Sequence, residues 1–124
     1  MLNIKKLVYE QVAATGLTIK DNPNGGSYGV VPYGLVRTIN QAPINFKNFK
    51  RNYWLLRVDI FSAYKGEKEI MDLFESIKNN INSLLTTNQE ITYINLSLEI
   101  IDDKEQGPIN KHGIVTIDIK TMEV

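Results

Sequence analysis

The chain has 124 residues with 14 basic and 14 acidic side chains, so its formal net charge is +0, and its 43% hydrophobic and 23% charged content suit one globular domain over residues 1–124. A dedicated nucleic-acid binder usually carries a basic excess because phosphate contacts supply most of its affinity, so the balanced charge argues against that class. The absence of cysteine (Cys 0) excludes disulfides, thiolate catalysis and cysteine-ligated metal sites.

Residues 3–14 predict the first helix. Asn3 is suited to cap its start, and Gly16 to end it in the left-handed conformation. The apolar residues that recur at helical spacing are Ile4, Leu7, Val8 and Val12. This start of the chain has no apolar signal-peptide core, and no run approaches the ~20 apolar residues that span a bilayer, so we expect no membrane association.

A loop and a strand are predicted next. Residues 20–29 concentrate Asn, Pro and Gly, which is typical of a loop, and they lack the Gly-Lys-Ser/Thr ending of a phosphate-binding loop. Residues 30–39 favour a strand, with Pro32 at its beginning or on an edge, and with Gly34 weakening it. Residues 40–51 are polar and are interpreted as a connection.

Residues 52–64 predict a strand of unusual length. Its apolar side chains alternate, with Arg57 and Asp59 on the opposite face. At ~3.3 Å per residue the run approaches ~40 Å, so we expect part of it to extend past the core as an arm. The apolar residues of the first face are Trp54, Leu56, Val58 and Ile60.

The rest of the chain completes an α+β pattern. Residues 67–85 carry an apolar stripe that predicts a second helix covering a sheet, and residues 92–101 and 113–122 alternate as two further strands. Short links favour antiparallel pairing. We therefore expect a two-layer sandwich, a four-stranded mainly antiparallel sheet with two helices packed on one face.

No catalytic, cofactor or metal site is predicted. His112 precedes a strand and is interpreted as a turn residue, because its neighbours offer no base partner or orienting group. Asp102, Asp103 and Glu105 lack the spacing of a calcium-binding loop and are interpreted as a solvated acidic turn. We expect neither an enzyme nor a cofactor.

The basic residues Lys47, Lys50 and Arg51 allow three interpretations. Interleaved with aromatic residues between Phe46 and Trp54, they suit a single-stranded nucleic-acid site, or a charged link whose aromatics pack inward. The third interpretation pairs this basic segment with the net acidic 99–105 region of another copy in a head-to-tail assembly. The oligomer interface residues predicted on this basis are Lys47, Lys50, Arg51, Asp102, Asp103 and Glu105.

The order and spacing of these elements resemble a known family. The segments that carry the resemblance are Val31-Pro32-Tyr33, the strand Leu55–Ser62, the helix start Ile70–Leu73, and a His112-Gly113 turn into Ile114–Ile119. Together, over nearly the whole chain, they resemble the tail completion, or tail terminator, proteins of long-tailed bacteriophages and prophages, also described as head–tail joining proteins.

The resemblance implies a structural virion protein. It implies an α+β domain that forms a ring, typically a homohexamer, which caps the tail tube, ends its polymerisation and joins it to the head connector. The partners would be other copies, the tail tube protein and the head completion protein, with at most transient contact to DNA in the lumen. The protein would be located at the head–tail junction of a virion that is assembled in the host cytoplasm. The alternatives are another head-completion or minor tail adaptor, or a small intracellular ligand- or nucleic-acid-binding module.

Overall fold

The computed structural model describes residues 3–19, 32–45, 50–102, 109 and 111–123. The elements in chain order are α1 (Ile4–Ala13), β1 (Thr18–Ile19), β2 (Tyr33–Asn45), β3 (Lys50–Ser62), α2 (Lys68–Asn82), α3 (Leu84–Thr87), β4 (Ile91–Asp102) and β5 (Lys111–Glu123). The described strands form one five-stranded sheet in the order β1-β2-β3-β5-β4. β1 runs parallel to β2, and the other neighbours are antiparallel.

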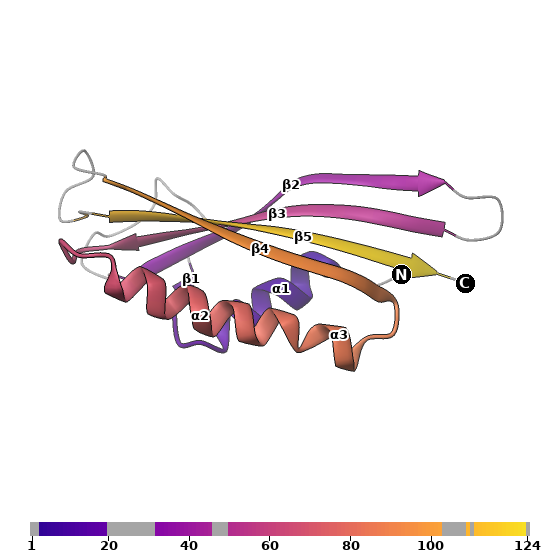
Figure 1. Cartoon of the computed structure of the whole chain (residues 1–124), viewed down its shortest axis with the longest axis horizontal. Coiled ribbons are helices and arrows are strands. Elements are labelled where there is room, and N and C mark those ends of the chain that lie inside the picture. Colours follow the sequence, from indigo (N-terminus) through magenta and orange to yellow (C-terminus); the bar gives the residue numbers. More distant parts are fainter. Residues whose placement is uncertain (1–2, 20–31, 46–49, 103–108, 110, 124) are drawn as a thin grey trace.

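The helices lie along one face of the sheet, and no described helix covers the other (Figure 1). We call this second side the uncovered face; it carries the β3 side chains Tyr53, Leu55, Arg57, Asp59 and Phe61 and their cross-strand partners. Figure 1 also shows that β2, β3 and the end of β5 continue past the helices. The predicted arm is therefore a long β2–β3 hairpin, with 13 residues in each strand, rather than a single strand.

The hydrophobic core lies between the helices and the covered face. The side chain of Asn3 accepts a hydrogen bond of 3.1 Å from the Lys6 backbone N–H and starts α1 as predicted. Along the helices and the central strands, apolar side chains at helical and alternating spacing meet in one cluster. Its fully buried members include Ile4, Val8, Val12, Leu56, Val58, Ile60, Ile70, Ile77, Ile81, Val115, Ile117 and Ile119.

The prediction of an α+β fold is confirmed, but the strand number differs. The sheet has five described strands rather than four, because Thr18–Ile19 adds a short parallel edge beside Tyr33 and Gly34. A strand of two residues is too short to carry an alternation signal. Gly34 itself pairs regularly with Ile60, and the irregularity in β2 lies between Thr38 and Asn40 instead.

The interpretation of residues 40–51 as a polar connection is wrong. β2 continues to Asn45 and β3 begins at Lys50, so strand covers most of that range. The ends of β2 and β3 continue past the helices (Figure 1), and residues 40–44 are exposed or only half-buried, so no apolar alternation marks them. The second helix also departs from the prediction, since it breaks at Ser83 into α2 and the four-residue α3.

Candidate functional site

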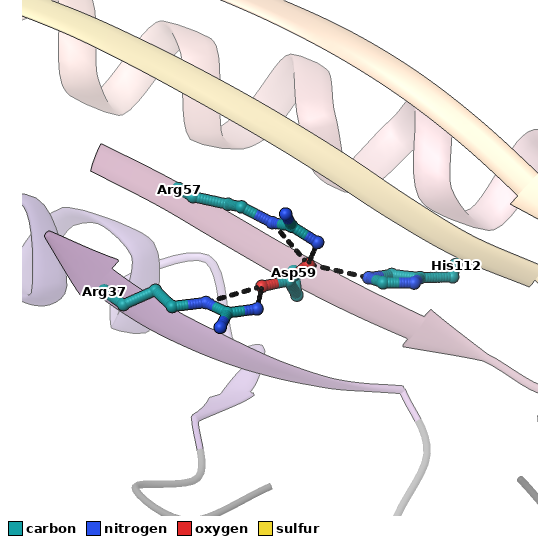
Figure 2. Close-up of polar contacts among 4 residues, drawn as sticks. All are labelled: Arg37, Arg57, Asp59 and His112. Carbon is teal, nitrogen blue, oxygen red and sulfur yellow. Dashed lines mark hydrogen bonds and ion pairs between the residues drawn. The ribbon is translucent and has the colours of Figure 1, made fainter. Parts of the chain in front are cut away.

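The register of the sheet gathers four charged or polar side chains on the uncovered face. Arg57 and Asp59 alternate onto this face of β3. Arg37 of β2 lies directly opposite Arg57, while His112 of β5 lies opposite Phe61, the next residue of β3 on that face. Figure 2 shows Arg37, Arg57 and His112 converging on Asp59 from three neighbouring strands. We call these four residues the Asp59 cluster.

The carboxylate of Asp59 accepts hydrogen bonds on both oxygens. Arg37 donates to Oδ2 from Nη2 at 2.8 Å and from Nε at 3.3 Å. Arg57 reaches Oδ1 from Nε at 2.9 Å and from Nη2 at 2.8 Å, and Nε2 of His112 lies 2.7 Å from the same oxygen. The Asp59 side chain is fully buried, whereas those of Arg37 and Arg57 are 53% and 33% exposed.

This geometry holds Asp59 in its charged form at neutral pH. Burial alone raises the pKa of a carboxyl, but the hydrogen bonds from His112, Arg57 and Arg37 outweigh burial and hold the pKa of Asp59 well below its ordinary range. A carboxylate with so low a pKa and both oxygens occupied is a poor proton acceptor for catalysis. With two guanidinium groups and one carboxylate, the cluster carries a net positive charge at neutral pH even when His112 is neutral.

The interpretation of His112 as a turn residue is wrong. It lies within β5, its ring stacks on Phe61 with centroids 4.4 Å apart, and Phe61 in turn stacks on Tyr33 at 4.8 Å. Tyr33 and Phe61 belong to a second buried apolar cluster on this face, with Leu35 and Ile109. His112 is therefore held between the aromatic stack and the carboxylate of Asp59. Because Asp59 lies 53 residues earlier in the chain, the sequence neighbours of His112 do not indicate this partner.

Further polar pairs order the same face. The hydroxyl of Tyr53 donates a 2.5 Å hydrogen bond to Asp118, and this bond, with burial and the charge of Asp118, raises the pKa of Tyr53. Nζ of Lys120 lies 4.9 Å from the ring centroid of Tyr93. The uncovered face thus holds charged groups and aromatic rings in defined positions.

The predicted interface residues that can be located lie at opposite ends of the sheet. Lys50 is exposed and pairs with Glu123 at one end of β5, whereas Asp102 is exposed and pairs with Lys111 at the other end. Thirteen-residue strands separate these ends by about 40 Å. Within one chain they therefore do not meet, and Asp102 instead forms an ion pair with Lys111. Arg51 is partly buried beside Lys50. Lys47, Asp103 and Glu105 lie outside the described residues.

Sequence reasoning did not find the Asp59 cluster. It placed Arg57 and Asp59 on the correct face but assigned them no partners, and it missed Arg37. One signal was present: an aspartate in the middle of an otherwise apolar strand requires a cation if the strand is central. The identity of the cations depends on strand order, which the sequence does not display.

A cavity of about 510 Å³ lies at the start of α2. It is lined by Pro32, Tyr64, Gly66, Lys68, Glu69, Asp72, Leu73 and Ser76. Beside it, the Ser62 hydroxyl donates to Glu69 Oε1 at 2.7 Å. Among the described residues, no group of three or more His, Cys, Asp or Glu side chains is arranged to hold a metal ion. No described helix is long and apolar enough to cross a membrane.

The sequence matches no protein-family model and no curated protein. The fold does match solved structures. One similar chain belongs to the virion of a native gene transfer agent particle; the two share a TM-score of 0.59 and 10% sequence identity, and the match covers 97% of this chain and 95% of that chain. At this identity the likeness shows a shared fold over nearly the whole of both chains.

Proposed function

We propose that this protein is a structural component of a phage-type virion and, within that class, a tail terminator. In this role a ring of copies, six in our proposal, caps the tail tube, ends its polymerisation and forms the joint with the head connector. The observation that carries the proposal is the match to a chain of a gene transfer agent virion, because it spans 97% of this chain and 95% of that chain. The order of elements in the sequence, which resembles the tail terminator family, supports the narrower assignment.

The distribution of surface features supports an assembly role. The β2–β3 hairpin continues past the helices and offers a surface that does not belong to the core (Figure 1). On the uncovered face, the Asp59 cluster fixes two partly exposed guanidinium groups in position. Side chains that are held before binding lose less conformational entropy at an interface than free ones do. In this proposal the protein binds and caps; it catalyses nothing and needs no cofactor.

The proposal is tested by tube assembly in vitro. A candidate tail tube protein from the same genome is polymerised with and without the purified chain, and tube lengths and tube ends are recorded by negative-stain electron microscopy. We expect tubes that stop growing and carry an extra ring at one end. Tubes of unchanged length with bare ends would overturn the tail terminator assignment. Binding of the chain to head or minor tail proteins instead would favour another virion adaptor.

The basic end of the hairpin provides a variant for the same assay. Replacing Lys47 and Lys50 with Glu reverses charge at the predicted interface, and Arg51 is left in place because it is partly buried. We expect the double variant to remain folded but to lose capping, because opposite charges that fix register become like charges. The matched control replaces Lys5 and Lys6, both exposed on α1, with Glu and should cap normally. If both variants cap the tube equally well, the basic segment is not part of the interface.

A further inference from the structure

The outer edge of β4 has no strand partner in the part of the chain that the structure describes. Among the described strands, β4 pairs only with β5, so 12 residues from Ile91 to Asp102 present one edge without a strand partner. An edge strand of this kind carries a row of outward backbone N–H and C=O groups that can accept another strand. Proteins usually protect such edges with prolines, bulges, charges or covering segments.

The opposite edge of the sheet carries such protection. β2 is covered at Tyr33 and Gly34 by β1, has a register shift between Thr38 and Asn40, and contains Pro43, which has no N–H to donate. Among the described residues, no covering strand, register shift or proline protects the β4 edge from Tyr93 to Asp102, and the whole strand has two charged residues, Glu99 and Asp102. Of the two edges, β4 is therefore the one built to accept a strand.

We propose that β4 pairs antiparallel with β4 of a second copy, about a two-fold axis at Ser97. The register follows from the side chains. The pairs on the covered side would be Ile94 with Ile100 and Leu96 with Leu98, and those on the uncovered face Tyr93 with Ile101, Asn95 with Glu99, and Ser97 with Ser97.

Three features favour this register. Shifting the pairing of the two β4 strands by one residue would bring the apolar side chains of one copy to the polar face of the other. Only shifts by an even number of residues keep the apolar side chains of both copies on the same face. Of these, the register centred on Ser97 joins Tyr93 and Ile101, which are 44% and 40% exposed in the single chain. It also sets Glu99 opposite Asn95, so no two like charges face each other. Shifting by two residues in one direction would instead set Tyr93 opposite Glu99.

This contact does not rest on the tail terminator proposal. It joins two copies through an edge that the hairpin and the Asp59 cluster do not use. The two-fold pairing closes on itself, which satisfies the edge without propagating into fibres. The test also distinguishes two other partners for the β4 edge: the β2 edge of a second copy, and an extended segment of another protein.

A cysteine scan tests the register. The chain has no cysteine (Cys 0), so each introduced thiol is the only one. Residues directly opposite on antiparallel strands have Cα atoms roughly 4.5–5.5 Å apart, within the range that a disulfide bridges. We expect Ser97→Cys to cross-link into a dimer under mild oxidation. Asn95→Cys alone should not, because its two copies would lie roughly 14 Å apart, but it should cross-link when mixed with Glu99→Cys.

A substitution that introduces a charge tests the same contact without a cross-linking reaction. Ser97 is exposed in the single chain, so Ser97→Lys leaves the fold intact while placing two ammonium groups face to face at the axis. We expect sedimentation equilibrium to show a dimer for the unmodified chain and a dissociation constant raised roughly tenfold or more for Ser97→Lys. The matched control, Gln41→Lys on β2, should leave the dimer unchanged. Dimer loss with Gln41→Lys but not Ser97→Lys would show that β2 is the contact, and a strictly monomeric chain with no specific cross-link would also overturn the proposal.

Discussion

Replacing Asp59 with Asn tests the energetic role of the Asp59 cluster. The change keeps the size of the side chain but removes its charge, and it turns one acceptor oxygen into a donor that faces Arg37 or Arg57. Removing one partner of a buried ion pair typically costs about 3–5 kcal/mol, because it leaves a charge without compensation. Here water can still reach the stranded groups, since the side chain of Arg37 is 53% exposed and that of Arg57 33% exposed. We therefore expect the free energy of unfolding to fall by about 2–4 kcal/mol.

The assay is urea unfolding followed by circular dichroism at pH 7. The matched control is Asp118→Asn, which removes a carboxylate from the same face but affects a single hydrogen bond, the one from Tyr53, which the Asn oxygen can still accept. It should lower the free energy of unfolding less than Asp59→Asn does. A loss below about 0.5 kcal/mol for Asp59→Asn, which is the range of ordinary surface changes, would refute the reasoning.

The free energy of unfolding at acid pH provides a second test, because the pKa of Asp59 fixes the direction in which stability changes with pH. The pKa of Asp59 is lower in the folded chain than in the unfolded chain, because His112, Arg57 and Arg37 hold its charged form. Its contribution to stability is therefore complete above an unfolded pKa of about 4 and is lost as the pH falls toward the folded pKa. We expect the difference in stability between the unmodified chain and Asp59→Asn to shrink between about pH 5 and pH 2.5. A difference that stays constant would contradict this assignment.

Two further predictions concern local structure. At Gly113, an added Cβ would lie 2.5 Å from Cγ2 of Ile70, so Gly113→Ala should lower the free energy of unfolding by about 1–3 kcal/mol in the same urea assay. Gly66→Ala, where nothing lies within 4 Å, is its control and should change stability little. Asn3→Ala removes the cap of α1 and should cost about 1 kcal/mol, measured by thermal unfolding, and an unchanged melting temperature would show that the cap contributes nothing.

The parts of the fold that could be predicted are those with a local signal. The helical spacing of Ile4, Val8 and Val12, and the alternation from Trp54 to Ile60, arise from burial of one face of each element, and the structure confirms both. The end of the hairpin that continues past the helices gave no such signal, because its side chains are not buried on one face. The same reasoning explains why residues 40–45 were assigned to a connection although they form strand.

The sequence alone determined the α+β composition, the apolar faces and the absence of disulfide and thiol chemistry, because each follows from residue type or from spacing within one element. Only the tertiary structure decided that Arg37, Arg57 and His112 meet at Asp59, because these residues come from three strands whose order and register arise when separate elements pair. It also decided that β4 has no second strand partner among the described strands. Such contacts join residues far apart in the chain, so their partners appear only once the sheet is assembled.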